Sequence, residues 1–323
     1  MQITLTGAET RAPRPLPEWL NQARPAAQEA MEYLALNSHS FRYAARFLPA
    51  PLDQRVAEMY AFCRFTDDLV DCADLSETPA SLRIRLDSWR RLAEASHAGH
   101  PSGLPLLDRA MGEMGRRDIP FTYASELIEG VGMDLTPSRY PDWEALEVYT
   151  YRVASVVGLW MTELAGEKDP WMLARAADLG AAMQLTNIAR DVGEDWRNGR
   201  LYLPLDLLAR HGVDDADLDR MAAEGGKAEV TPRWRAVMAE LMERAEAHYA
   251  RALPAIFKLP ATFRRPILVS ALVYRDIHTA LRKNGCENFA RRARTTLARK
   301  MWLGLRAQLM LRAARAGRKV VLP

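Results

Sequence analysis

The feature that most constrains the fold of this 323-residue chain is helical periodicity. From about Pro25 onward, apolar residues recur with a spacing near 3.6 in nearly every segment, and no stretch shows the alternation typical of a strand. The periodic segments end at glycine and proline clusters such as HAGHPSGLP and LTPSRYP. The sequence therefore predicts an all-α fold, with helices over 25–36, 40–48, 51–73, 79–97, 103–116, 121–134, 142–164, 169–198, 204–210, 215–225, 231–257, 261–284 and 294–315.

The domain organisation follows from the same pattern. Residues 1–24 are rich in proline and arginine and lack periodicity, so we expect a loose N-terminal arm. Residues 25–315 contain no linker long enough to divide them, and 49% of the chain is apolar, so they are expected to form one domain with a sizeable core. Residues 316–323 are expected to form a short basic tail.

Cysteine content and hydropathy favour a cytoplasmic protein. The three cysteines are an odd number without metal-type spacing, which fits a reducing compartment and not a disulfide framework. The chain has no charged-then-apolar leader, so no signal peptide is expected. It also lacks a run of about 18 apolar residues, so no membrane span is expected.

Two segments place acids on predicted helices whose other residues are mostly apolar. In VAEMYAFCRFTDDLVDCAD, one side carries Ala57, Tyr60, Arg64, Asp67, Asp68 and Asp71. In QLTNIARDVGEDWRNGRLYLP, one face carries Gln184, Asn187, Asp191 and Asp195. Like charges four residues apart destabilise a helix by roughly 0.2–0.5 kcal/mol per pair, so counter-charge is expected nearby. Since apolar residues flank these charges, the two stripes are predicted to face an enclosed cavity from both sides.

Paired carboxylates suit Mg²⁺ or Mn²⁺, because these cations prefer hard oxygen ligands. An arginine precedes each acid pair, Arg64 in the first stripe and Arg190 in the second. Arginine forks bind phosphate oxygens, so the combination predicts a site for metal plus diphosphate. A single D-x-x-x-D pair is usually a solvated face or a local salt bridge, but two such pairs on apolar helices favour the site. A nucleotide site is excluded, because neither G-x-x-x-x-G-K-[ST] nor a strand followed by G-x-G-x-x-G occurs.

Four segments resemble the bacterial phytoene/squalene synthase family, nearest to its phytoene synthases: YAFCRFTDDLVD, DLTPSRYPDWEALEVYTYRVASVVG, QLTNIARDVGEDWRNGRLYLP and YRDIHTALRKNGCENFARRARTT. The resemblance covers about Asn37 to Lys300, in the family's order. It implies an isoprenoid-synthase-type helical bundle around a central cavity, which condenses two prenyl diphosphates head to head with Mg²⁺. One substrate ionises, the other attacks the cation to give a cyclopropylcarbinyl diphosphate, and this intermediate ionises and rearranges. Phytoene synthases then lose a proton, whereas squalene synthases take hydride from NADPH.

The resemblance also implies site residues by position. Metal ligation is implied for Asp67, Asp68, Asp71, Asn187, Asp191 and Asp195, with Glu194 as a supporting acid. Diphosphate contacts are implied for Ser38, Ser40, Arg64, Gln184, Asn187, Arg190, Tyr274 and Arg291. Tyr60 and Tyr149 are expected to border the reacting carbons, where an aromatic face attracts a desolvated cation by up to about 2 kcal/mol. His39 departs from the family, in which many members have lysine. The alternatives are ordinary core tyrosines and an Arg291 that belongs to the basic tail.

Small residues indicate the length of the prenyl chain. Ala57 lies one turn before Tyr60, and Ala44 and Ala45 on the preceding predicted helix are also small. Together with Val153, Val157 and Gly158 they are expected to line a pocket deep enough to favour geranylgeranyl over farnesyl diphosphate. Beyond the second stripe, the Asn198-Gly199 break is expected to place Arg200 and Tyr202 in a loop near the mouth of the site.

The C-terminal segment is strongly basic. From Arg291 to Pro323 there are ten lysines or arginines and no acid, and the segment includes Trp302. Basic amphipathic helices lie on anionic lipid surfaces, so we expect peripheral membrane contact. The alternative is a helix packed on the core with solvated arginines. Nucleic acid is not an expected partner, because the basic run lacks a recognisable binding motif.

Other functions compatible with the pattern are less favoured. A squalene, dehydrosqualene or presqualene diphosphate synthase would use farnesyl diphosphate, and the absence of a dinucleotide fingerprint argues against NADPH as a cofactor. A terpene cyclase would usually carry an N-x-x-x-S-x-x-x-E-like second motif in place of the symmetric acid pair. A non-catalytic helical assembly factor would not need both acid motifs intact.

Overall fold

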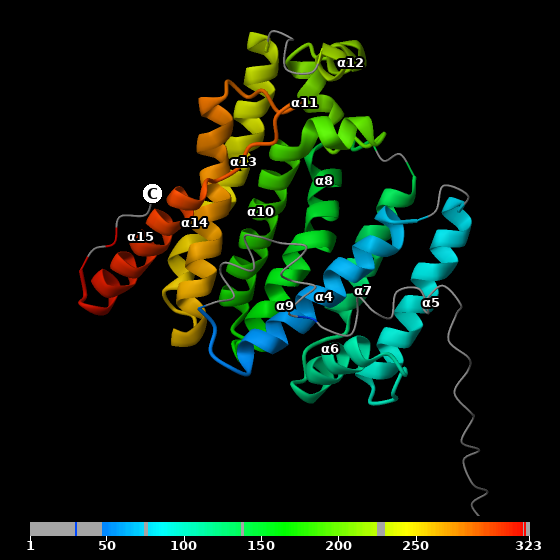
Figure 1. The fold of residues 1–323 in the computed structure, drawn as a ribbon, viewed down its shortest axis with the longest axis vertical. Coiled ribbons are helices and arrows are strands. Elements are labelled where there is room, and N and C mark those ends of the chain that lie inside the picture. Colours follow the sequence, from blue (N-terminus) through cyan, green and yellow to red (C-terminus); the bar gives the residue numbers. More distant parts are fainter. Residues whose placement is uncertain are drawn as a thin grey trace, which may run out of the picture.

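The computed structural model describes residue 30 and residues 47–73, 77–136, 139–224, 230–318 and 320. Over these residues the chain is helical, with a single isolated β-bridge between Arg139 and Leu201. The elements, labelled as in Figure 1, are α4 (Leu52–Asp71), α5 (Pro79–His97), α6 (Pro105–Arg116), α7 (Thr122–Gly132), the 3-10 turn η1 (Met133–Leu135), α8 (Trp143–Thr150), the π turn η2 (Tyr151–Ser155), α9 (Val156–Leu164), α10 (Pro170–Arg197), α11 (Leu205–Arg210), α12 (Asp215–Glu224), α13 (Pro232–Ile256), α14 (Ala261–Lys283) and α15 (Leu297–Arg315).

The all-α prediction is confirmed, and every helix predicted from residue 51 onward is present. The N-terminal arm and nearly all of the predicted helices 25–36 and 40–48 lie outside the described residues. Within the described part of the chain, no helix is both long and apolar enough to cross a bilayer.

Local sequence explains where the helices begin and end. Proline occupies the first turn of α5, α6, α10 and α13, where its missing N–H has no helical acceptor to lose. The Asp169 side chain caps α10 by accepting a hydrogen bond from the Met172 N–H at 3.0 Å. At the other end, Gly199 has a φ of +73°, a left-handed conformation that glycine adopts without strain. The chain therefore leaves α10 as a loop that carries Arg200 and Tyr202.

The segment predicted as one helix over 142–164 contains a π turn. Helix α8 continues through η2 into α9 without a loop. A Cβ added at Gly180 of α10 would lie 2.4 Å from Ala154 O, and one added at Gly158 of α9 would lie 2.5 Å from Ala176 O. The backbones of η2, α9 and α10 are therefore in direct contact, which larger residues at these two positions would prevent. The π turn changes the register of the side chains that follow Tyr149 relative to a regular helix.

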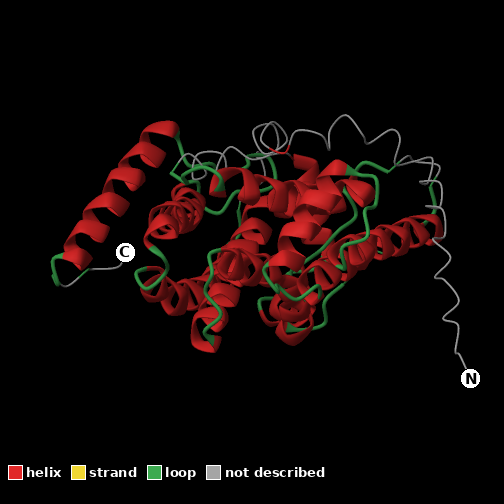
Figure 2. Cartoon of the chain, turned by 90° about the horizontal axis from the view of Figure 1, so that it is seen from below, coloured by secondary structure: helices red, strands yellow, loops and turns green. Residues whose placement is uncertain are grey.

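Helix α10 runs through the middle of the bundle, with α13 and α14 on one side and η2 and α9 on another (Figure 1). Helix α4 crosses the bundle obliquely and packs against α5, α6 and α7. Helix α15 lies at the outer edge of the molecule against α14, as both views show (Figures 1 and 2). The two helices with acid stripes, α4 and α10, thus belong to different parts of the bundle.

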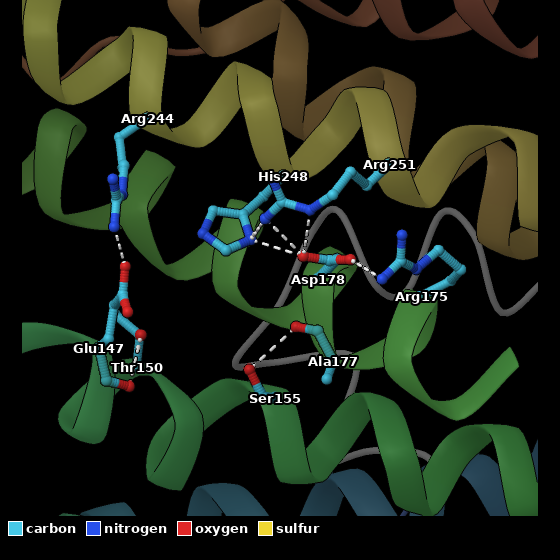
Figure 3. A network of polar contacts seen from close by, with 9 residues as sticks. All are labelled: Glu147, Thr150, Ser155, Arg175, Ala177, Asp178, Arg244, His248 and Arg251. Carbon is cyan, nitrogen blue, oxygen red and sulfur yellow. Dashed lines mark hydrogen bonds and ion pairs between the residues drawn. The ribbon is translucent and has the colours of Figure 1, made fainter. Parts of the chain in front are cut away.

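An ionic cluster fixes the first half of α10 to α13 (Figure 3). Asp178 of α10 accepts hydrogen bonds from Arg251 Nη2 at 2.7 Å and from His248 Nδ1 at 2.8 Å, and Arg175 Nη2 lies 3.1 Å from its second oxygen. In the same region, Ser155 of η2 donates to Ala177 O of α10 at 2.9 Å. These contacts hold α13, α10 and η2 together on the N-terminal side of the acid stripe of α10.

Candidate active site

A polar cavity of about 280 Å³ lies between α4 and α10. Its wall combines five aspartates with four arginines: Asp67, Asp71, Asp134, Asp191 and Asp195, and Arg64, Arg190, Arg200 and Arg292. The other lining residues are Val70, Val131, Tyr149, Val153, Gln184, Asn187, Ile188 and Tyr202. The structure therefore brings the two acid stripes to one cavity, and each helix contributes both aspartates of its D-x-x-x-D pair.

The α4 wall contributes Asp67 and Asp71. Asp71 accepts a hydrogen bond from Arg200 Nη2 at 3.0 Å, so an arginine from the loop after α10 offsets its charge. Burial and the nearby carboxylates of Asp71 and Asp68 raise the pKa of Asp67 to about 8, although Arg64 opposes this shift. Asp68, a predicted metal ligand, instead lies 2.5 Å from Arg64 Nη2 and does not line the cavity.

The α10 wall contributes Asp191 and Asp195. Arg190 donates from Nε and Nη2 to the two oxygens of Asp191 at 2.7 and 2.5 Å, and Arg292 Nε lies 2.8 Å from Oδ1. Burial and the carboxylates of Asp191 and Glu194 raise the pKa of Asp195 to about 7. Each wall thus has one aspartate bound by arginine and one whose ionisation is disfavoured by its neighbours.

The donor set fits Mg²⁺. The Asn187 amide donates from Nδ2 to Gln184 Oε1 at 3.3 Å, while its own Oδ1 is buried without a hydrogen-bond partner. Carboxylate and amide oxygens are the ligands that Mg²⁺ and Mn²⁺ prefer. Within the described residues, no three acidic, histidine or cysteine side chains converge on one metal-sized point. An open set of this kind suits a cation that takes one or two carboxylates and completes its shell with substrate phosphates.

The segment after α14 delivers an arginine that the sequence analysis missed. Asn288 donates from Nδ2 to Ala189 O at 2.7 Å, and Gly193 N–H donates to Asn288 O at 3.2 Å, so this segment is fixed along α10. As a result Arg292, not the predicted Arg291, reaches the site, while Arg291 is exposed and does not line the cavity. Helical spacing could not distinguish these neighbours, because the segment is not helical.

Asp134 is a second residue that the sequence analysis missed. It lies in η1 and accepts hydrogen bonds from Tyr202 OH at 2.8 Å and from Tyr149 OH at 3.1 Å. Burial raises the pKa of Asp134, although the Tyr202 hydrogen bond and Arg200 oppose this shift. The rings of Tyr149 and Tyr202 stack with centroids 4.9 Å apart. The only signal in the sequence was that Asp134 opens the second of the four family-like segments.

Backbone hydrogen bonds hold the group of Asp134, Tyr149 and Tyr202 in place; we call this group the aromatic corner. Arg139 and Leu201 form the isolated bridge, and Leu205 N–H donates to Tyr140 O at 2.9 Å. The loop after α10 is therefore attached to the loop before α8. This arrangement confirms that Arg200 and Tyr202 lie at the site, as the Asn198-Gly199 break predicted.

Several predicted residues do not line the polar cavity. Tyr60 packs against the core, and Tyr274 is buried beside Arg190, with which it hydrogen-bonds. Ala57 is fully buried in the core, and Val157 packs against the core. Neither of these two lines the polar cavity or the apolar cavity described next, so the expectation that Ala57 and Val157 line the prenyl pocket is not met in either cavity. The predicted residues Ser38, Ser40 and Ala45, with His39 and Ala44, lie outside the described residues.

An apolar cavity of about 50 Å³ lies further along the same helices. Gly158 of α9 and Leu179 of α10 line it, whereas Val153 and Gln184 of the same helical segments line the polar cavity. Five residues of helix correspond to about 7 Å. The predicted pocket residues Val153 and Gly158 are thus divided between the polar cavity and a separate apolar cavity.

Comparison with known proteins agrees with this geometry. The sequence profile described as squalene/phytoene synthase matches residues 34–299. A phytoene synthase from Rhodobacter capsulatus is 37% identical over 84% of this chain and 78% of its own length. A 15-cis-phytoene synthase from a Paracoccus species is 34% identical over 84% of this chain and 87% of its own length.

The solved structures give the same fold. A dehydrosqualene synthase crystallised with a ligand superposes with a TM-score of 0.79 at 26% identity, covering 91% of this chain and 99% of that one. A squalene synthase from Alicyclobacillus acidocaldarius superposes with a TM-score of 0.70 at 22% identity, covering 84% of this chain and 97% of that one. The likeness thus extends from sequence to the helical isoprenoid-synthase fold. On these grounds the chain belongs to the squalene/phytoene synthase family.

Proposed function

We propose that this protein is a prenyltransferase that condenses two geranylgeranyl diphosphates head to head to phytoene, the first step of carotenoid biosynthesis. The observation that carries the proposal is the single cavity into which α4 and α10 each bring two aspartates, surrounded by four arginines. The phytoene synthases at 34–37% identity support the choice of product.

Carboxylates on facing walls suit a metal-bridged diphosphate. Asp67 and Asp71 would hold Mg²⁺ on one side, and Asp191, Asp195 and the free Asn187 Oδ1 on the other. When bound, Mg²⁺ offsets the negative charge that develops on a departing diphosphate. We infer a requirement for Mg²⁺, which Mn²⁺ should replace, because both cations prefer such oxygen donors.

The arginines would bind the diphosphates directly. Arg190 and Arg292 contact Asp191, and Arg200 contacts Asp71. Arg190, Arg200 and Arg292 all line the cavity and would fork onto phosphate oxygens of the bound diphosphates. Preorganised positive groups at the leaving oxygens favour ionisation to the allylic cation. Gln184 lines the same wall and is placed to donate to a phosphate oxygen.

The aromatic corner would border the reacting carbons. Tyr149 and Tyr202 present stacked rings to the cavity, and Asp134 holds both hydroxyls. A fixed aromatic surface can stabilise a carbocation without acting as a nucleophile. It would face the first cation, formed before attack by the second double bond, and the cation formed when the cyclopropylcarbinyl diphosphate ionises.

The prenyl chains would extend away from the polar cavity. Val153 and Gln184 line the polar cavity, and Gly158 and Leu179, five residues away along η2–α9 and α10, line the separate apolar cavity, so we infer that the chains run toward it. Apolar chains are expected to occupy such a space because burial is favourable by roughly 25 cal/mol per Å². The runner-up is synthesis of squalene or dehydrosqualene from farnesyl diphosphate, and the dehydrosqualene synthase likeness is its main support.

The decisive experiment is product identification. The purified protein is incubated with Mg²⁺ and either geranylgeranyl or farnesyl diphosphate, with and without NADPH, and the hydrocarbons are identified by mass spectrometry. We expect phytoene from geranylgeranyl diphosphate, unaffected by NADPH. A product from farnesyl diphosphate alone would replace this proposal with the runner-up, and no product from either substrate would refute both.

A further inference from the structure

Helix α15 exposes an apolar stripe. Five of the nine large apolar side chains exposed in the described part of the chain lie on α15, with exposed fractions between 46% and 68%. They are Leu297, Met301, Trp302, Leu305 and Leu309. Four of them recur at every fourth position, so they form one continuous row on the helix surface. We refer to these five residues as the apolar stripe.

The opposite face of α15 already has a partner. Leu303, Ala307 and Met310 are buried, and α15 packs on α14. The exposed apolar stripe therefore lies on the face of α15 away from the core. Helix α15 itself lies at the outer edge of the molecule (Figure 2). A helix that is apolar on two opposite faces needs a second apolar environment.

The charge of α15 indicates what that environment is. The helix carries Arg299, Lys300, Arg306, Arg312 and Arg315 and no acidic residue. A second copy of the same helix would bring these charges against each other. An anionic surface would be attracted, with each basic residue near a lipid surface contributing roughly fivefold in affinity.

A cationic cavity lies beside the stripe. It has a volume of about 240 Å³ and is lined by Glu246, Leu272, Arg275, Asp276, Thr279, Arg282, Arg299, Leu303 and Arg306, from α13, α14 and α15. Arg275 Nε donates to Glu246 at 2.6 Å, and Arg299 Nε donates to Asp276 at 2.9 Å. Arg282 and Arg306 have no ion-pair partner among the described residues. The lining therefore holds two more positive than negative charges and can accept a phosphate.

Trp302 connects the stripe to this cavity. Its ring centroid lies 4.4 Å from Arg299 Cζ and 5.4 Å from Arg306 Cζ, and both arginines line the cavity. Tryptophan prefers the interface between lipid chains and headgroups, because its ring is apolar and its N–H is polar. Apolar side chains, an interfacial tryptophan and a cationic cavity large enough for a phosphate group thus follow one another around the outside of α15.

We propose that α15 docks on an anionic phospholipid membrane, with the apolar stripe in the acyl boundary and a lipid phosphate in the cavity between Arg282 and Arg306. The inference rests on α13, α14 and α15 and uses none of the residues of the polar cavity between α4 and α10. Its test is a binding measurement, so it stands or fails separately from the proposed reaction.

The test is flotation of the full chain with vesicles of phosphatidylglycerol or of phosphatidylcholine. We expect strong recovery with phosphatidylglycerol, weak recovery with phosphatidylcholine, and a loss of binding as salt rises. The double variant Leu305→Asp, Leu309→Asp should lower the partition coefficient for anionic vesicles by roughly 20-fold or more. The control Ile84→Asp, at an equally exposed apolar residue of α5, should bind like the wild type.

A second pair of variants tests the cavity. The first is the double variant Arg282→Ala, Arg306→Ala, which removes two arginines of the cavity. The second is the double variant Arg312→Ala, Arg315→Ala, which removes the same charge from the same part of the molecule. If a lipid phosphate occupies the cavity, the first pair loses binding at least about fivefold more than the second. Circular dichroism and melting temperature establish that each variant is folded.

Three results would overturn the proposal. Equal recovery with neutral and anionic vesicles would refute the electrostatic contact with the membrane. Equal losses of binding for the two arginine pairs would refute the binding of a lipid phosphate in the cavity. A stripe variant that binds vesicles normally but changes its elution volume on size exclusion would assign the stripe to a second copy of the chain.

Discussion

Helix α10 carries two aspartates whose surroundings are opposite in charge. Near its start, Asp178 is enclosed by cations: burial raises its pKa, but hydrogen bonds from Arg251 and His248 outweigh burial, so the pKa lies below its usual value. Near its end, burial and the carboxylate of Asp191 raise the pKa of Asp195 to about 7. The same residue type on the same helix is therefore neutralised at one end and left with excess negative charge at the other.

The difference separates a structural cluster from a binding site. A buried carboxylate with enough cations around it is satisfied and holds helices together. A group of carboxylates that raise one another's pKa is a candidate functional site, because an added cation would relieve the repulsion. Asp178 therefore stabilises the fold, whereas Asp195, with Asp67 on α4, belongs to the site proposed to bind Mg²⁺ and diphosphate.

The largest expected effect is on the rate of catalysis, which should differ between substitutions at the two ends of α10. Asp195→Asn keeps the shape of the side chain but removes a metal-binding charge, and we expect phytoene formation to fall by at least about 10²-fold. Asp178→Asn should leave the rate per folded molecule within about twofold. Steady-state rates on geranylgeranyl diphosphate check this, and equal losses in the two variants would contradict the comparison.

The free energy of unfolding should distinguish the same two variants in the reverse order. Asp178→Asn replaces the charged acceptor of Arg251 and His248 by a neutral amide oxygen and ends the ion pair with Arg175, so we expect a loss of about 2 kcal/mol in the free energy of unfolding. Asp195→Asn removes repulsion and should not destabilise the metal-free protein. Urea unfolding in the presence of a chelator measures both. A destabilised Asp195→Asn protein would mean that this carboxylate has a structural role.

Two neighbouring arginines offer a finer test of the candidate active site near the C-terminal end of α10. Arg292→Ala should lower kcat/KM by about tenfold, because Arg292 contacts Asp191 and is placed to bind phosphate. Arg291→Ala removes the same charge from the next residue, which is exposed and does not line the cavity. We expect no change for Arg291→Ala. The reverse order of effects would restore the assignment made from the sequence.

The smallest expected effect is in the pH dependence of stability without metal. The folded pKa of Asp195 is raised, so its contribution to stability is complete below its unfolded pKa near 4 and is lost as pH rises through about 7. The folded pKa values of Asp178 and His248 are depressed, the latter by burial, so their contributions are present at neutral pH and lost on acidification.

Denaturant titrations at several pH values check these opposite signs. Asp195→Asn should flatten the decline in stability between about pH 5 and pH 8, while Asp67 maintains part of it. Asp178→Asn should flatten the decline on the acid side. Unchanged profiles in both variants would show that these pKa shifts do not control stability.

Much of the fold could be predicted from the sequence because its signals are local. Proline and glycine mark the helix ends, so α5 was predicted from its first to its last residue. The acid stripes were also predictable, since helical spacing alone places Asp67 near Asp71 and Asp191 near Asp195. That both stripes reach one cavity was inferred from chemistry and is borne out by its lining.

The remainder depends on contacts between distant segments. Arg292 reaches Asp191 only because Asn288 fixes a non-helical segment along α10, and no periodicity describes such a segment. Asp134 joins the site through hydroxyls that lie 15 and 68 residues further along the chain. The π turn η2 lies within a continuous helical pattern, and its backbone is in close contact with Gly180 of α10.

The most direct test of the account is calorimetric binding of a non-ionisable geranylgeranyl diphosphate analogue, with Mg²⁺ or with a chelator. We predict tight binding only with Mg²⁺, unchanged in Asp178→Asn and lost in Asp195→Asn. Binding of equal strength with the chelator, or full retention of Mg²⁺-dependent binding in Asp195→Asn, would contradict the claim that the two acid walls hold a metal-bridged diphosphate.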